Sequence, residues 1–141
     1  MEIRDVVNIV PIIPEEKSVI LQRKDLGYNK FWPRMGGKWF LFGGKVEQGE
    51  HPYRAAQREF HEEMGIYRPK LDFSHRAPYL IQDRAQGMQH IFTFTTDKNM
   101  RKYRIGEGAG VSLFHVSELE HLSIAEWDKE RLLTVLKEQG W

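Results

Sequence analysis

Three glutamates in the middle of the chain have the type and the spacing that suit metal chemistry. Glu59, Glu62 and Glu63 stand at i, i+3 and i+4, so on an α-helix, which turns about 100° per residue, their carboxylates share one face. Like charges this close repel each other unless a cation lies among them. Carboxylate ligands suit Mg²⁺ or Mn²⁺ rather than Zn²⁺. A solvated acidic face is the alternative interpretation of these three residues taken alone.

The helix that must carry these carboxylates has a clear beginning and end. Pro52 suits a first helical position, because its missing N–H needs no partner there. Gly65 suits the left-handed conformation that follows a helix. Arg58 stands four residues before Glu62 and can brace it, although one arginine does not neutralise three glutamates. Three apolar residues with helical spacing form the face expected to pack inward: Ala56, Phe60 and Met64.

The other elements are expected on both sides of this helix. Stretches rich in Val, Ile and aromatic residues predict strands at 5–13, 17–23, 39–42, 71–82, 88–96 and 111–116. The strand at 39–42 is expected to run into Gly43-Gly44, and residues 24–38 are expected to form a long loop. A second helix is predicted to open at Ser123-Ile124-Ala125-Glu126, a capping box. Strands interleaved with two helices indicate a layered α/β or α+β domain.

Composition excludes several other classes of protein. The chain has 141 residues, the size of one domain spanning 1–141, and no cysteine, which rules out thiolate metal sites and a cysteine nucleophile. Its net charge of +1 argues against stable binding to nucleic acid or to an anionic membrane. No stretch approaches the roughly 18 apolar residues of a membrane helix. The first residues lack the pattern of a secretory signal, so a cytoplasmic location is expected.

Residues 44–66, GKVEQGEHPYRAAQREFHEEMGI, resemble the signature of the Nudix hydrolases, and every fixed position of that 23-residue box is filled. These positions are Gly44, Glu50, Arg58-Glu59-Phe60, Glu62-Glu63 and Gly65-Ile66. His51 and Phe42 stand where the family more often has a small polar cap and a proline. Neither position belongs to the ligand set.

The resemblance implies an α/β/α sandwich around a mixed sheet, in which the box forms a loop, a helix and a loop. It implies that Glu59, Glu62 and Glu63 bind Mg²⁺, with Mn²⁺ as the other candidate, and that the Gly43 or Gly44 carbonyl completes the shell. Glu59, or a glutamate from a later loop, would orient or deprotonate the attacking water. Arg58 would hold the glutamates in register and Glu50 would anchor the loop. Lys45 is expected to meet a phosphate, with a solvated loop lysine as its alternative.

Weaker candidates lie outside the box. Glu107, in a glycine-rich segment, resembles the additional metal-binding and catalytic carboxylate of the family, with a turn residue as the alternative. Trp32 is equally consistent with stacking on a base, packing of its loop and a homodimer contact. Trp127 and Asp128 are candidates for contacting the base, although core packing explains Trp127 as well.

The sequence therefore predicts a Mg²⁺-dependent Nudix pyrophosphohydrolase acting on a nucleotide. A run at Phe42-Gly43-Gly44-Lys45-Val46 looks like members that hydrolyse (oxidised) nucleoside triphosphates to the monophosphate and pyrophosphate. The alternatives are an ADP-ribose, nucleotide-sugar or dinucleoside polyphosphate hydrolase, and a non-catalytic module that senses a nucleotide.

Overall fold

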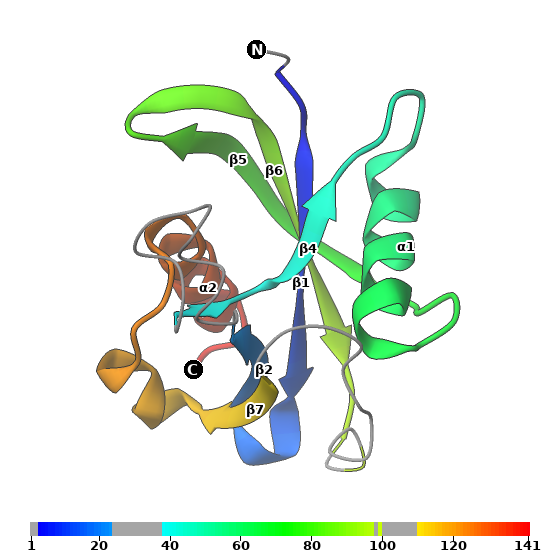
Figure 1. The fold of residues 1–141 in the computed structure, drawn as a ribbon. Coiled ribbons are helices and arrows are strands. Elements are labelled where there is room, and N and C mark those ends of the chain that lie inside the picture. The colour runs from blue at the N-terminus through cyan, green and yellow to red at the C-terminus, as the bar shows by residue number, and fades with distance from the viewer. Residues whose placement is uncertain (1–2, 24–37, 98, 100–109) are drawn as a thin grey trace.

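A mixed β-sheet forms the middle layer of the molecule (Figure 1). The computed structural model describes residues 3–23, 38–97, 99 and 110–141. Within these residues the strands are β1 (Val6–Ile13), β2 (Ser18–Arg23), β3 (Trp39–Phe40), β4 (Phe42–Lys45), β5 (Asp72–Ile81), β6 (Arg84–Thr95) and β7 (Gly110–His115). The helices are α1 (Pro52–Met64) and α2 (Glu126–Glu138), with 3₁₀ turns at Pro14–Glu16 and Val116–His121.

Strand β1 is the centre of the sheet. It runs parallel to β6 and antiparallel to β2 and β4. The path through the sheet is β3-β2-β1-β6-β5, with β4 added on β1 and β7 on β2. Strand β3 pairs with β2, where Phe40 faces Gln22, whereas β4 pairs with β1, where Phe42 faces Ile9. The sheet therefore forks at Leu41, which belongs to neither strand.

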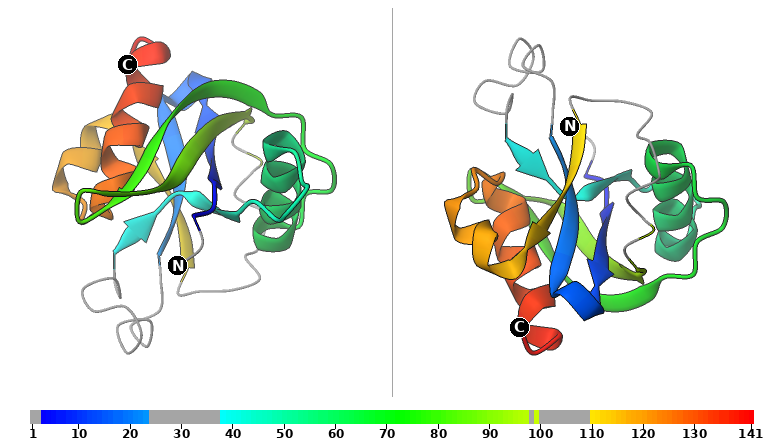
Figure 2. Two further views of the ribbon diagram at one scale, coloured as in Figure 1. Left: turned by 90° about the horizontal axis from the view of Figure 1, so that it is seen from above. Right: turned by 90° about the horizontal axis from the view of Figure 1, so that it is seen from below.

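The two helices cover opposite faces of this sheet (Figure 2). Ala55, Ala56, Phe60 and Met64 of α1 are buried against one face. Leu132, Val135 and Leu136 of α2 are buried against the other. Strand β1 contributes to both cores, because alternate residues of a strand point to opposite faces. The predicted α/β/α sandwich is confirmed.

Helix α1 begins and ends as the sequence predicts. Pro52 is its first residue, and Gly65 follows it with φ 73°, in the left-handed region. The ring of His51 serves as the cap, since its Nδ1 accepts a hydrogen bond of 3.0 Å from the Tyr53 N–H. An imidazole therefore does the work that a serine or aspartate usually does at this position.

The predicted capping box of the second helix is wrong. Helix α2 begins at Glu126, and its N-cap is Ala125, which makes no side-chain cap. The Ser123 carbonyl instead accepts a hydrogen bond from the Trp39 N–H at 2.9 Å, and Ile124 pairs with Trp39. This pairing holds residues 123–125 extended beside β3, so the helix cannot start earlier.

The strands follow the predicted ranges with three differences of more than one residue. The single strand predicted at 39–42 is divided at Leu41 into β3 and β4. Strand β6 begins at Arg84, four residues before the predicted start. Strand β4 runs through both glycines instead of stopping at them. Gly43 has φ 151° and lies against β1 so closely that a Cβ would clash with the Val7 carbonyl. Within the described residues, no helix is both long and apolar enough to cross a membrane.

Candidate active site

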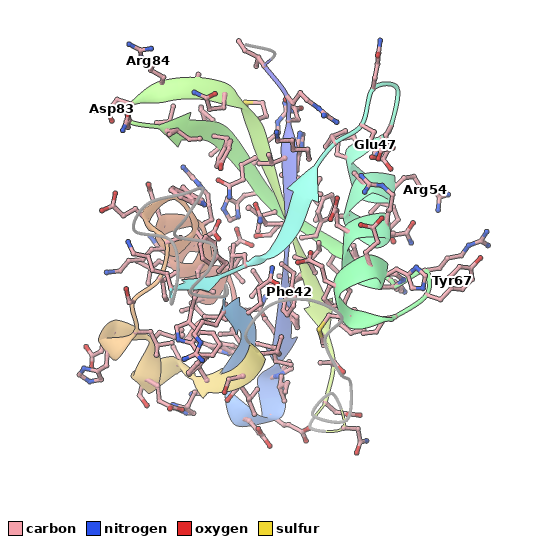
Figure 3. All side chains as sticks on the ribbon, viewed as in Figure 1. Phe42, Glu47, Arg54, Tyr67, Asp83 and Arg84 are labelled. Atoms are coloured by element: carbon pink, nitrogen blue, oxygen red, sulfur yellow. The ribbon has the colours of Figure 1, made fainter. Side chains whose placement is uncertain are left out.

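The predicted metal-binding glutamates lie on the part of α1 that faces β4. Glu59 is half-buried, with 16% of its side chain exposed, whereas the side chain of Glu62 is 57% exposed. Phe42 lies between the sheet and α1, while Arg54 and Tyr67 point away from the sheet on the outer side of the helix (Figure 3). Glu59 and Glu63 lie on the side of α1 that borders β4, because Glu59 packs against Gly44 and Glu63 accepts a hydrogen bond from the Gly43 N–H.

Arg58 ties the loop before α1 to the helix. Its Nε and Nη2 donate to the two carboxylate oxygens of Glu50, each at 2.9 Å, which is a bidentate pair. Its Nη1 donates to Glu59 at 2.8 Å and lies 3.6 Å from Glu62. Its Nη2 also donates to the Lys45 carbonyl at 3.1 Å. The predicted bracing role of Arg58 and the predicted anchoring role of Glu50 require such contacts, and both roles stay predictions.

The two carboxyls on Arg58 have opposite electrostatic environments. Hydrogen bonds from Arg58 and from the Glu47 N–H lower the pKa of Glu50 from 4.5 to about 2. Burial raises the pKa of Glu59 above its ordinary value, although Arg58 acts in the other direction. The charged form of Glu50 is therefore stabilised by its hydrogen bonds, whereas the charged form of Glu59 is disfavoured by its partial removal from water.

Gly44 has no room for a side chain. A Cβ on this residue would clash with the Glu59 carboxylate, so the Glu59 side chain packs directly on the β4 backbone. This close approach brings a carboxylate and the peptide groups of Gly43-Gly44 into the same small volume. The predicted participation of the Gly44 carbonyl needs such an approach.

Glu63 points to the strand rather than to its two neighbours on the helix. One carboxylate oxygen accepts a hydrogen bond from the Gly43 N–H at 2.8 Å. The other accepts one from the Gln22 side-chain amide at 2.6 Å. Glu63 thus connects α1 to β4 and to β2.

A model of the NUDIX domain family matches residues 2–135. The chain belongs to the Nudix family. This match confirms the family predicted from the box and, at the level of class, a pyrophosphohydrolase.

Solved Nudix structures share the fold at low sequence identity. A mutT/nudix family protein from Listeria innocua has a TM-score of 0.71 at 19% identity, covering 99% of this chain and 94% of its own. The Nudix domain of Shewanella oneidensis NrtR, complexed with ADP ribose, has a TM-score of 0.76 at 13% identity, covering 98% and 89%. The MutT protein from Bacillus halodurans has a TM-score of 0.61 at 23% identity, covering 94% and 82%.

One curated relative is an octanoyltransferase from Myxococcus xanthus, 32% identical over 68 residues. The match spans 48% of this chain and 17% of that protein. It covers too little of the octanoyltransferase to carry that activity over.

The Nudix glutamates provide the donors that a magnesium site needs, because carboxylate and carbonyl oxygens are what Mg²⁺ prefers. They are not gathered into a ready cluster, since among the described residues no three acidic or imidazole groups lie close enough to hold a metal ion. Glu59 is engaged by Arg58, and Glu63 by Gln22 and Gly43. The chemistry of the donors therefore suits Mg²⁺, and metal binding requires the carboxylates to come together, with Glu59 sharing its oxygens between Arg58 and the metal.

The other predicted site residues lie in varied surroundings. Lys45 is exposed at the end of β4. Trp127 is half-buried, with its ring 6.2 Å from that of Phe40. Asp128 is 2% exposed, and its carboxylate accepts a hydrogen bond from the Leu41 N–H at 3.0 Å. Trp32 and Glu107 lie outside the described residues, so their predicted roles stay predictions.

Sequence reasoning missed three polar side chains that surround the β3–β4 junction: Asn8, Gln22 and Gln89. Gln22 and Gln89 are 5% and 1% exposed. Gln89 donates to Asn8 at 2.8 Å and lies 3.4 Å from an Asp128 oxygen. A signal was present, because Gln22 and Asn8 interrupt apolar strands, and a buried amide needs hydrogen-bonding partners.

Proposed function

We propose that this Nudix protein is a Mg²⁺-dependent pyrophosphohydrolase that cleaves a nucleoside triphosphate to the monophosphate and pyrophosphate. The observation that carries the proposal is the complete box folded around one arginine, with Glu50, Glu59 and the backbone carbonyl of Lys45 all accepting hydrogen bonds from Arg58. This arrangement places the carboxylate face of α1 against the glycine-containing strand β4.

The residues of the chain have separate tasks in this proposal. Glu59, Glu62 and Glu63 would hold the metal, with the Gly44 carbonyl. Such an ion, when bound, lowers the pKa of its water and neutralises phosphate charge. Lys45, exposed beside this face, would bind the departing phosphates as a point charge. Arg58 would keep the carboxylates in place while substrate enters.

The positions of these groups support the assignment of an internal phosphorus as the one attacked. Glu59, Lys45 and the glycine strand lie around the same end of the acidic face. A triphosphate spanning that place presents an internal phosphorus to the water that Glu59 or Glu107 would orient. The base would extend toward Trp127 or Trp32. Base identity should then change KM and kcat without moving the bond that breaks.

A second candidate is hydrolysis of ADP-ribose or a related nucleoside diphosphate. The observation in its favour is the Shewanella oneidensis NrtR Nudix domain, which shares this fold in complex with ADP ribose. A catalytically idle module that senses a nucleotide, a dinucleoside polyphosphate hydrolase and a nucleotide-sugar hydrolase belong to the same comparison. The predicted cytoplasmic location and homodimer rest on the sequence alone.

The test is product analysis with purified protein, Mg²⁺ and a panel of nucleotides that includes dGTP and ADP-ribose. We expect dGMP and pyrophosphate from dGTP, with ¹⁸O from labelled water in one of these two products. Glu62→Gln serves as the control for contaminating hydrolases. Formation of dGDP and orthophosphate as first products would refute the placement of the triphosphate. Turnover of ADP-ribose alone would favour the second candidate, and no turnover of any nucleotide would favour the idle module.

A further inference from the structure

At the fork of the sheet around Leu41, backbone N–H and carbonyl groups form hydrogen bonds with side chains. The chain pairs with β2 up to Phe40 and with β1 from Phe42 onward, so the peptide groups between these two residues do not belong to one continuous hydrogen-bond ladder. Four side chains from four different elements take up the polar groups of this short segment: Asp128 on the Leu41 N–H, Gln22 on the Leu41 carbonyl, Asn8 on the Phe42 carbonyl and Glu63 on the Gly43 N–H.

Gln22 is the member of this group that touches a predicted metal ligand. Its Nε2 donates to the Leu41 carbonyl at 3.2 Å and to Glu63 at 2.6 Å. Both partners are acceptors, so the amide can face them only with its nitrogen. Gln22 is 5% exposed, so loss of either partner would leave a buried polar group without its hydrogen bond. The side chain therefore has one orientation, fixed from both ends.

We infer that Gln22 is a positioning residue for Glu63, a role that rests on the proposed metal site. Gln22 and the Gly43 N–H each occupy one oxygen of the Glu63 carboxylate. Residues that hydrogen-bond a metal-binding carboxylate fix its orientation. These two contacts hold the Glu63 carboxylate in one orientation, against β2 and β4. Glu62, by contrast, is 57% exposed, and its ion pair with Arg58 is 3.6 Å long.

The same strand segment is held from the opposite face of the sheet. Asp128, in the first turn of α2, accepts from the N–H of Leu41, whose carbonyl Gln22 binds. Gln22 and Asp128 therefore hold the same residue through its two successive peptide groups, and Gln22 links that residue to the Glu63 carboxylate on α1. Residues that orient metal ligands in this way typically change metal affinity or activity by about 10–100-fold when they are removed.

The first experiment replaces Gln22 by Met, which keeps the length of the side chain and removes its amide. We expect Gln22→Met to weaken Mn²⁺ binding to the nucleotide-free protein, measured by electron paramagnetic resonance, by about 10–100-fold. Where a nucleotide is hydrolysed, kcat should fall more than KM rises. The matched control is Ser18→Ala, on the same strand, where a side chain 3% exposed loses its hydrogen bond to the Glu16 carbonyl. Its Mn²⁺ affinity should equal that of the wild type.

Wild-type Mn²⁺ affinity in folded Gln22→Met, with only a lower melting temperature, would overturn the inference and leave Gln22 a packing residue. The failure of the proposed function looks different, because the wild-type chain would then bind Mn²⁺ and hydrolyse no nucleotide, while Gln22→Met would still lose affinity. No Mn²⁺ binding by the wild-type chain would overturn both.

A second measurement needs no variant and stays decisive if Gln22→Met does not fold. In the metal-free wild-type protein, the side-chain amide protons of Gln22 should exchange with solvent much more slowly than those of Gln48, which is exposed. Addition of Mg²⁺ should shift the Gln22 amide resonances and leave those of Gln48 in place. Equal exchange rates for the two amides, or no response of Gln22 to Mg²⁺, would overturn the inference.

Discussion

Replacing Arg58 by Met should destabilise the metal-free fold, and the loss should depend on pH. Met removes the guanidinium and keeps an apolar side chain of similar reach. The variant loses the bidentate pair with Glu50 and the hydrogen bonds to Glu59 and the Lys45 carbonyl. Arg58→Lys is the matched control, because it keeps the charge but cannot bind a carboxylate with two parallel hydrogen bonds.

The magnitude follows from the pKa of Glu50. A fall from 4.5 to about 2 is equivalent to about 3 kcal/mol if it is converted in full. The Arg58 and Glu50 side chains are 27% and 17% exposed, so water screens the pair and we expect about 1–2 kcal/mol. For a domain of this size, that corresponds to a melting temperature lower by about 3–10 °C at pH 7.

The sign of the pH dependence is fixed by the direction of that pKa. Because the folded pKa of Glu50 lies below its unfolded value, its contribution to stability is complete above pH 4.5 and is lost as the pH falls toward 2. The free energy of unfolding, from urea titrations between pH 7 and pH 3, should show a gap between wild type and Arg58→Met that narrows below pH 4.5. In a Glu50→Gln background the gap should not narrow. A gap of equal size at pH 7 and pH 3 would refute the reasoning.

Two further predictions concern the carboxylates and the glycine beside them. Glu62→Gln should lower turnover by about 100-fold or more and leave the melting temperature unchanged, because the Glu62 side chain is mostly exposed. Glu63→Gln should lower turnover too, and it should also lower the free energy of unfolding by about 1–3 kcal/mol, since the new amide would face two N–H donors. Equal melting temperatures for the two variants would contradict this difference. Gly44→Ala should push the Glu59 carboxylate away and reduce kcat by about 10–100-fold, and a wild-type kcat would show that the close approach has no role.

The sequence predicts the parts of the molecule that depend on local pattern. The 3.6-residue period of Ala56, Phe60 and Met64 gives the buried face of α1, and all three are buried. Pro52 and Gly65 fix the ends of the helix through their own backbone preferences. The box is read from spacing within 23 residues, so its placement on a loop and a helix needs no tertiary information.

Features that depend on distant partners could not be predicted in the same way. The pattern at Ser123 is typical of a capping box, but pairing with Trp39, 84 residues earlier, holds this segment extended. From charge repulsion alone, Glu63→Gln would not be expected to destabilise the fold. The destabilisation follows from the hydrogen bond with Gly43, which lies 20 residues earlier and is not visible in the local pattern. Gln22 and Asp128 contact partners 41 and 87 residues distant. Their polar character inside apolar elements signals that a partner exists and does not say which one.

The fork at Leu41 explains why these distant polar residues meet at one short segment of the sheet. A strand that changes partners leaves peptide groups between two ladders, and buried peptide groups without partners are costly. Side chains must then be supplied from the neighbouring elements, and Glu63 of α1 is one of those supplied. The Glu63 carboxylate thus provides a hydrogen-bond partner for the Gly43 N–H, and the same contact orients the carboxylate. A charge held in this way is oriented before any metal or nucleotide arrives, which is what an ion site built on a rigid helix requires.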